Sequence, residues 1–289
     1  MAIAAQVPGP EIVSADAFTI YRGMDIGTAK PSPEELNALP HHMMNIVDPA
    51  SLEPFTVHDW LTRAERIIAD IQTRGGTPIV VGGTNLYVMA LLNGLFEGPE
   101  PDASLRELLR QIPIAELRAE LERVDPIAAG RIHANDERRT IRALEVYRQT
   151  GTPISQLQKQ WEELPRKEDR VLVGLIWPIE AINKRINARV KAMMEAGFLQ
   201  EVTDLYRAGK LGPQAREALG YKQLLEHLEG RCTLDEAVEE IKIETRRFGK
   251  NQRTWLKRLR LTPRSVWIDA EVMAQEQWAG KVLEAMAEP

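Results

Sequence analysis

Short apolar runs that alternate with helical patterns constrain the fold of this chain more than any other feature. Residues 11–15 and 78–81 are predicted as short strands, and apolar residues at helical spacing predict helices over 59–73 and 84–93. Strand, helix, strand, helix is the order of a parallel sheet that helices cover. Apolar runs at 170–177 and 266–268 predict two more strands, so the fold class is α/β, with a parallel sheet flanked by helices.

The pattern changes to helices alone in the middle of the chain. Residues 98–101 contain a glycine and two prolines and form a predicted linker, and Asp102 can cap the helix that follows. The helices predicted in this stretch are 102–111, 113–123, 136–149 and 154–162. We therefore expect an all-helical insertion domain at 98–165, within an α/β core formed by 1–97 and 166–289.

The composition of the 289 residues excludes several classes of protein. The single cysteine, Cys232, rules out a disulfide framework and a cysteine-built zinc site. Neither the adjacent His41 and His42 nor His58 has the spacing of a metal cage, so we expect no protein-bound metal among the histidines. No apolar run is long enough to span a bilayer, and the predicted location is the cytoplasm, without membrane contact.

Charge is distributed unevenly along the chain. The net charge is −5, but residues 246–264 carry eight cations and no acid. Arg246, Lys250, Arg253 and Lys257 step by four, three and four, so they line one side of a predicted helix, and we call these four residues the basic stripe. Phe248, Trp255 and Leu259 fall on other sides and are predicted anchors. Such segregation favours an anionic partner.

Two loops that follow predicted strands hold candidate ligand-binding residues. Asp16 comes at the carboxyl end of the first strand, where open α/β sheets bind ligands. A base or metal-linked acid and a simple turn former are both possible roles for it. Thr84 follows Gly82 and Gly83 at a helix N-terminus and can bind a phosphate or a base, or can simply cap the helix.

Two further motifs leave alternatives open. The run from Tyr21 to Pro31 contains Gly27 and Lys30, which suit phosphate contact, although an ordered loop explains them equally. The arginines of residues 138–142 can share a helix face and hold a nucleic-acid backbone. They can also form ion pairs with the acids at 136, 137 and 145 on a solvated helix.

Taken together, these stretches resemble one family. The motifs that carry the resemblance run in the family's order: residues 11–31, His41–Pro49 (HHMMNIVDP), Gly82–Tyr87 (GGTNLY), the helix 135–146, Gly220–Lys222 (GYK) and Gln252–Leu256 (QRTWL). The set is similar to that of the tRNA dimethylallyltransferases, or isopentenyl transferases, and it covers nearly the whole chain.

The resemblance implies a fold like that of P-loop kinases, with nucleotide-binding character, in which a helical insertion grips the tRNA anticodon stem-loop. The implied reaction moves a dimethylallyl group from dimethylallyl diphosphate to the exocyclic amine of the adenosine on the 3′ side of the anticodon. Mg²⁺ is the implied cofactor and assists the leaving diphosphate. The target base must leave its stack, and a carboxylate must orient or accept a proton of the amine. We expect the protein to act as a monomer.

The resemblance also assigns roles to single residues. Asp16 is the implied general base, and Arg189 is the implied ligand of the diphosphate. The residues implied to contact tRNA are Asp16, Ala17, Phe18, Thr19, Thr84, Arg106, Arg138, Arg139, Thr140, Ile141 and Arg142.

One part of the family pattern is absent from this sequence. The family begins with a strand and a Walker A loop, before the helix that leads to the equivalent of Glu11, and no G-x-x-x-x-G-K-[ST] motif occurs here. This sequence begins at the predicted end of that helix, so the missing part would be about 20–25 residues. One explanation is that the cellular protein starts upstream of Met1, which we favour. The alternative is a catalytically inactive tRNA-binding remnant. A nucleotide or small-molecule kinase of related fold is a third alternative, and the missing Walker A loop weakens it most, because the tRNA-facing features do not compensate for the loss.

Overall fold

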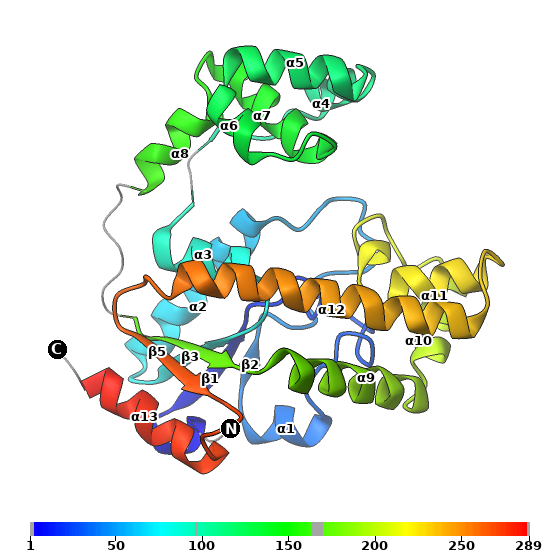
Figure 1. Ribbon diagram of the computed structural model, residues 1–289. Helices are drawn as coiled ribbons and strands as arrows, with labels where there is room; N and C mark the ends of the chain where they lie inside the picture. The colour runs from blue at the N-terminus through cyan, green and yellow to red at the C-terminus, as the bar shows by residue number, and fades with distance from the viewer. Residues whose placement is uncertain (1–2, 96–97, 163–169, 288–289) are drawn as a thin grey trace. The chain divides into compact units, whose positions relative to one another are not determined.

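The computed structural model describes residues 3–95, 98–162 and 170–287 (Figure 1). The chain divides into two compact units: residues 1–90 with 168–289, here called the α/β unit, and residues 91–167, here called the helical unit. The first division falls a few residues before the boundary predicted at 97/98. The second predicted boundary, at 165/166, lies outside the described residues.

The α/β unit contains two parallel sheets. In the first, β1 (Pro10–Ser14) lies between β2 (His41–His42) and β3 (Thr77–Val81). In the second, β4 (Leu172–Ile176) pairs with β5 (Ser265–Asp269). The predicted fold class and strand direction are confirmed, while the strands are divided between two sheets because β4 hydrogen-bonds to β5 and not to β3.

Helices surround both sheets. They are α1 (Pro33–Ala38), α2 (Val57–Thr73), α3 (Asn85–Asn93), α9 (Ile179–Glu195), α10 (Phe198–Arg207), α11 (Tyr221–Leu228), α12 (Leu234–Leu259) and α13 (Gln275–Ala287). The long helix α12 packs along α9 and α11 (Figure 1). Its start is fixed by a capping box, in which the side chains of Thr233 and Glu236 each accept the other residue's backbone amide.

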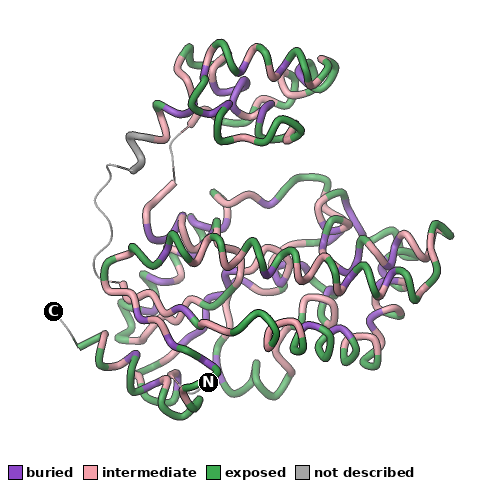
Figure 2. The backbone as a smooth tube through the Cα atoms, viewed as in Figure 1, coloured by how far each residue is buried: buried purple, intermediate pink, exposed green. Residues whose placement is uncertain are grey.

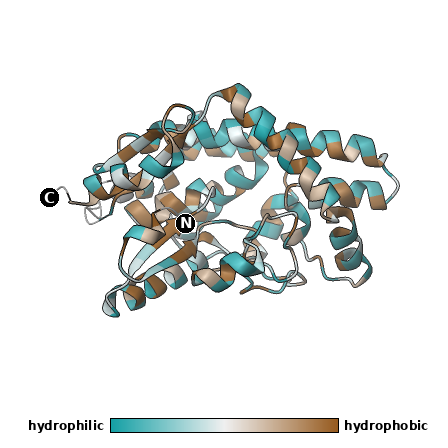
Figure 3. Ribbon diagram, turned by 90° about the horizontal axis from the view of Figure 1, so that it is seen from below, coloured by the Kyte–Doolittle hydropathy of each residue, from teal (hydrophilic) through white to brown (hydrophobic). Residues whose placement is uncertain are grey.

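The core of the α/β unit forms where α2 covers the first sheet. β1 is buried almost along its whole length, and the apolar side of α2 places Trp60, Ala64 and Ile71 fully inside. The buried segments of the tube in Figure 2 follow these inner faces, and the helices in Figure 3 show the matching alternation of apolar and polar residues. Burial of this apolar face is what fixes α2 against the strands.

The helical unit has its own core. Its helices are α4 (Ala103–Arg110), α5 (Ile114–Val124), α6 (Pro126–Arg131), α7 (Glu137–Thr150) and α8 (Ile154–Glu162). Leu109, Leu117, Leu121 and Leu144 are fully buried against one another. The predicted all-helical character of this stretch is thus observed, with α6 as an additional helix.

Helices α10 and α11 were missing from the sequence prediction. So were two six-residue helices, α1, which lies in a stretch with few periodic signals, and α6, which falls between two predicted helices. Each begins with a proline next to a capping side chain, Ser32 for α1 and Asp125 for α6. Six residues are too few for apolar periodicity to show, so only the caps signal such helices. None of the described helices combines the length and the apolar character that crossing a bilayer requires.

Candidate functional site

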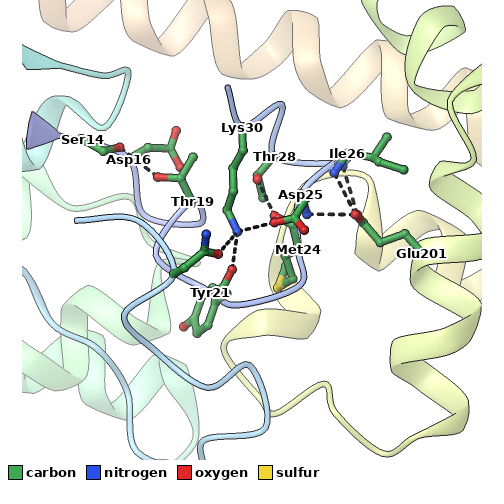
Figure 4. Close-up of polar contacts among 12 residues, drawn as sticks. Ser14, Asp16, Thr19, Tyr21, Met24, Asp25, Ile26, Thr28, Lys30 and Glu201 are labelled. Carbon is green, nitrogen blue, oxygen red and sulfur yellow. Dashed lines mark hydrogen bonds and ion pairs between the residues drawn. The ribbon is translucent and has the colours of Figure 1, made fainter. Parts of the chain in front are cut away.

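Asp16 stands directly after β1 and shapes the loop that follows. Its Oδ1 accepts hydrogen bonds from the backbone amides of Phe18, at 2.8 Å, and Thr19, at 3.1 Å. The hydroxyls of Ser14 and Thr19 close the same loop with a hydrogen bond of 2.9 Å (Figure 4). Asp16 is therefore a turn former, as one alternative predicted. Among the described residues only Oδ1 makes these contacts, which leaves Oδ2 for a ligand.

The Thr84 turn is joined to the Asp16 loop by three hydrogen bonds. The Ala17 amide donates to the Thr84 hydroxyl at 3.0 Å, the Thr84 amide donates to the Ala15 carbonyl at 3.1 Å, and the Ala15 amide donates to the Val81 carbonyl at 2.8 Å. A β-carbon at Gly82 would lie 2.2 Å from the Ala15 carbonyl oxygen, so only glycine permits this approach. The structure thus brings Asp16 and Thr84 into one constellation.

The stacked rings of Trp60 and Tyr87 pack next to the Asp16 loop and the Thr84 turn. The indole nitrogen of Trp60 donates to the Ser14 carbonyl at 2.9 Å, and its ring stacks on Tyr87 at 4.6 Å. Burial raises the pKa of Tyr87 above its usual value, and the charges of Tyr21 and Asp16 raise it further, so this phenol stays neutral near Asp16. Trp60 belongs to the apolar pattern that predicts the helix over 59–73, and nothing in that pattern indicates what the indole nitrogen contacts.

The loop that contains Lys30 is ordered by internal contacts. The Lys30 ammonium is almost fully buried and donates to the Tyr21 carbonyl, at 2.6 Å, and to Asp25, at 2.7 Å (Figure 4). Asn45 accepts a third bond from it. Lys30 is thus engaged with its own loop, and the alternative of an ordered loop describes it better than phosphate contact does.

Glu201, on α10, holds the middle of the same loop. Its carboxylate accepts hydrogen bonds from the backbone amides of Asp25, at 2.9 Å, and Ile26, at 2.8 Å (Figure 4). It also accepts the Tyr221 hydroxyl at 2.5 Å. A β-carbon at Gly27 would lie 2.1 Å from the ring of Phe198, which explains the glycine. Sequence analysis did not identify Glu201, since no local signal links it to a loop 175 residues earlier.

The basic stripe of α12 lies beside the Thr84 turn. Gln252, which precedes one of its arginines, donates to the Gly83 carbonyl at 3.0 Å. Within the described residues none of the four cations of the stripe forms an ion pair, and Arg246 donates to Asn187 of α9 at 2.8 Å.

The predicted anchors of this helix differ in burial. Leu259 is buried as predicted, whereas Phe248 is 48% exposed, so the prediction that Phe248 anchors the helix was wrong. Phe248 lies on the outer side, next to the buried Gly249.

Arg189 lies exposed on α9, two residues after Asn187. The hydrogen bond between Asn187 and Arg246 joins its helix to the basic stripe. No hydrogen bond among the described residues joins Arg189 to the Asp16 loop. Its predicted role at the diphosphate therefore stays a prediction.

In the helical unit, two of the predicted arginines share one acid. Glu145 of α7 is fully buried and accepts both Nε and Nη2 of Arg106, at 2.9 Å each, and Nη1 of Arg142 at 2.6 Å. Burial tends to raise the pKa of Glu145, but the hydrogen bonds from Arg106, Arg142 and the Asp102 amide outweigh it, and the net pKa is lowered. The predicted alternative of ion pairing with Glu145 is thus observed.

The rest of the run 138–142 divides between surface and core. Arg138 and Arg139 are exposed, and Arg139 forms an ion pair with Asp136 at 3.4 Å. Thr140 is fully buried and Ile141 is 6% exposed, because both lie on the inner side of α7. Their side chains therefore present no surface to RNA in this structure, and the ability to contact it rests with the arginines.

The fold and these sites define a class of protein. A carboxylate stands at the carboxyl end of a parallel strand beside a cationic helix, and a separate helical unit presents arginines. That is the arrangement of an α/β enzyme whose substrate is a large polyanion. The chain belongs to the IPP transferase family, whose model matches residues 19–259.

Relatives and solved structures agree with this assignment. The chain is 44% identical over 274 residues to the tRNA dimethylallyltransferase of Syntrophobacter fumaroxidans, an alignment that covers 92% of this chain and 78% of that one. It is 46% identical over 258 residues to the tRNA dimethylallyltransferase of Shouchella clausii, covering 88% and 82%. These names give no support to the alternative of an inactive tRNA-binding protein.

Two crystal structures match nearly the whole chain. The full-length tRNA isopentenylpyrophosphate transferase of Bacillus halodurans matches with a TM-score of 0.68 and 35% identity, over 98% of this chain and 91% of that one. A eukaryotic dimethylallyltransferase that acts on tRNA matches with a TM-score of 0.80 and 28% identity, over 98% and 73%. The fold described above is therefore that of the tRNA isopentenyl transferases.

Proposed function

We propose that this chain transfers a dimethylallyl group from dimethylallyl diphosphate to the exocyclic amine of the adenosine on the 3′ side of the anticodon in tRNA. A bond forms between the amine nitrogen and the terminal carbon of the dimethylallyl group. The bond from that carbon to the diphosphate oxygen breaks, and its electron pair leaves with the diphosphate. The amine gives up one proton. The observation that carries the proposal is the fixed carboxylate of Asp16 at the end of β1, in a chain of this family.

Asp16 serves this reaction as the group that orients the amine and takes its proton. An arylamine is a weak nucleophile, so removing the proton as the new bond forms lowers the barrier. Two backbone amides hold Oδ1, which fixes the direction of Oδ2, and no side chain in the described part of the protein bonds Oδ2 and competes for the proton. The hydroxyl of Thr84 keeps the loop in place through Ala17. Phe18 and Thr19 belong to the same loop and are the predicted contacts of the extruded base.

We assign cationic residues to the two anionic substrates, the diphosphate of the donor and the phosphate backbone of tRNA. Arg189 on α9 is our proposed ligand of the diphosphate, and the basic stripe beside the Thr84 turn carries the charge that a phosphate backbone requires. In the helical unit, the proposed contacts to the anticodon stem-loop are Arg106, Arg138, Arg139 and Arg142.

Mg²⁺ belongs to the proposal as a partner of the diphosphate. Within the described residues no three His, Cys, Asp or Glu side chains gather into a cation cage. Mg²⁺ characteristically keeps several waters and binds through substrate phosphates with only one or two carboxylates, so such a cage is not required. The metal would neutralise charge on the leaving group, and no step assigned here to a residue depends on it.

The proposal is tested with Asp16→Asn and Asp16→Ala. Asparagine keeps an oxygen for the two amides but cannot accept the proton, so we expect transfer to fall by about 10²–10⁴-fold while tRNA affinity is retained. Alanine also removes the loop contacts and should weaken tRNA affinity as well. The transfer rate is measured with labelled dimethylallyl diphosphate and a tRNA transcript, and the tRNA affinity with the same transcript. A transcript with guanosine at the target position is the control.

Two outcomes would contradict the proposal. Near wild-type transfer by Asp16→Asn would show that Asp16 is not the proton acceptor. Absence of any transfer by the wild-type chain, with tRNA still bound, would show a binding function alone. We also propose that the enzyme acts as a monomer and that it acts in the cytoplasm, where its tRNA substrate is found. Light scattering of the purified protein measures its oligomeric state.

A further inference from the structure

A single carboxylate, that of Glu145, organises the polar surface of the helical unit. Each of its oxygens accepts two hydrogen bonds. Oε1 accepts the Asp102 amide, at 2.8 Å, and Nε of Arg106, at 2.9 Å. Oε2 accepts Nη2 of Arg106, at 2.9 Å, and Nη1 of Arg142, at 2.6 Å. The side chain is 0% exposed, so it cannot itself contact a ligand.

The two guanidinium groups, by contrast, reach the surface. Arg106 and Arg142 are 31% and 30% exposed. In the described contacts Arg106 uses two of the five N–H donors that an arginine has, both directed at Glu145. Arg142 uses Nη1 for Glu145 and Nη2 for the Pro99 carbonyl at 3.0 Å. The remaining donors of both groups have no hydrogen-bond partner among the described residues, and the three charges sum to +1.

The network also fixes the backbone on which these arginines stand. Asp102 caps the start of α4 through Leu105, and Arg106 lies one turn further along the same helix. Arg142 lies three residues before Glu145 on α7. Glu145 therefore sets the distance and the angle between two guanidinium planes on two different helices.

Stability alone is a weak explanation for such an arrangement. Removing a carboxylate and two guanidinium groups from water costs as much free energy as their attraction returns, and apolar side chains of similar size can replace buried ion pairs without loss. Rigid guanidinium groups do bring an advantage in binding. Their side-chain entropy is lost on folding, so it is not lost again when a phosphate arrives.

We propose that Glu145 is a positioning residue that holds Arg106 and Arg142 as one preorganised clamp for the phosphate backbone of tRNA. The proposal rests on the proposed function, because it takes tRNA as the ligand of the helical unit. The clamp carries planar forks of donors that match phosphate oxygens. Glu145 makes no contact with RNA and acts only through the two arginines.

The proposal predicts a change of affinity opposite in sign to that expected from charge. Glu145→Gln keeps the size of the side chain and removes a negative charge, which by itself would strengthen binding to RNA. Glutamine also turns an amide group toward one of the arginines, so the clamp should come apart. We expect about tenfold weaker tRNA binding by Glu145→Gln, with KM for tRNA raised and kcat nearly unchanged.

Glu120→Gln is the matched control. Glu120 of α5 also binds one arginine, Arg148 of α7, through both oxygens, at 3.1 and 2.6 Å, within the same unit. The variant removes the same charge from a comparable pair that does not include the clamp. We expect its tRNA affinity to equal or slightly exceed that of the wild type.

Lysine variants keep the proposal testable if Glu145→Gln does not fold. Arg106→Lys and Arg142→Lys retain both charge and Glu145, but lysine cannot form the two-pronged contact. We expect severalfold weaker binding from each. In addition, Glu145→Gln should cause no further loss of tRNA affinity in an Arg106→Ala, Arg142→Ala background, because the loss arises only through these two arginines.

The outcomes separate this proposal from the proposed function. Unchanged or tighter binding by Glu145→Gln, or an equal loss with and without the two arginines, would overturn the clamp while leaving the transferase assignment intact. If the wild-type chain neither binds nor modifies tRNA, the proposed function itself fails.

Discussion

The backbone amide of Ala17 donates to the side-chain hydroxyl of Thr84 at 3.0 Å, across 67 residues of sequence. This bond joins the loop after β1 to the loop after β3. Since β1 and β3 are parallel neighbours, both loops leave the same edge of the sheet. The carboxylate of Asp16 is thus fixed from two strands at once, which a catalytic group requires if it is to meet one particular proton.

Replacing Thr84 tests this link. Thr84→Val keeps the shape but leaves the Ala17 amide without its partner, so we expect a stability loss of about 1–2 kcal/mol and a fall in kcat of tenfold or more. Thr84→Ser retains the hydroxyl and should keep most of the stability and most of the kcat of the wild type. Thermal unfolding and single-turnover transfer measure the two effects. Equal rates for Val and Ser would mean that the hydroxyl has no part in orienting the site.

Trp60 offers a second test of how the site is held. Trp60→Phe keeps an aromatic ring against Tyr87 but removes the indole donor to the Ser14 carbonyl. We expect a loss of about 1–3 kcal/mol of unfolding free energy, since the carbonyl is buried, together with slower transfer at unchanged KM for tRNA. Trp60→Leu removes the stacking as well and should destabilise further. A Phe variant with wild-type kcat would show that the indole only fills space.

The strands β1 and β3, their parallel direction and the two loops that follow them were predictable because they depend on local patterns. Apolar runs, glycines and caps indicated β1, β3 and the turns at Asp16 and Thr84, and the structure confirms these elements. What the patterns left undecided were choices between alternatives. Lys30 could serve phosphate or its own loop, and only the structure shows that it is bonded to Tyr21, Asp25 and Asn45.

Contacts between distant segments were not predictable in the same way. Glu201 looks like an ordinary helical glutamate, and for Glu145 the sequence predicts a pair within its own helix and not the contact with Arg106, since a single sequence records neither burial nor distant partners. Their function follows from the packing of α7 on α4 and of α10 on the loop that contains Gly27. Trp60 is a similar case, because its helical position predicts burial and says nothing about the Ser14 carbonyl.

The basic stripe predicts the salt dependence of tRNA binding. Arg253→Gln with Lys257→Gln removes two cations that form no ion pair within the described residues. If both face phosphates, the slope of log K against log salt should fall by about 0.7–0.9 for each cation. Lys191→Gln, with Lys191 77% exposed and paired with Glu195 on α9, is the matched control and should leave the slope unchanged. Identical slopes for all variants would place the tRNA elsewhere.

A buried acid at the start of the first sheet predicts how stability changes with pH. Glu11 of β1 accepts Nη1 of Arg74, and lies 2.6 Å from Nε2 of His42 on the neighbouring strand. The Arg74 bond, and next the His42 bond, hold the pKa of Glu11 at about 2, against 4.5 for an ordinary glutamate. The folded state therefore favours the charged form more than the unfolded state does.

The sign of the pH effect follows from that lowered pKa. Above about pH 4.5 the carboxylate is charged in both states, and its stabilising contribution is fully present. As the pH falls from 4.5 toward 2, the unfolded state takes up the proton first, and the contribution is lost.

Glu11→Gln lacks this group, so the difference in unfolding free energy between wild type and variant should shrink over that window. Arg74→Gln removes the larger cause of the shift, so the loss should be smaller and should be complete at a higher pH than in the wild type. Urea unfolding from pH 7 to pH 3 measures these differences, and a constant difference between wild type and Glu11→Gln across that range would show that Glu11 is not stabilised by its charge.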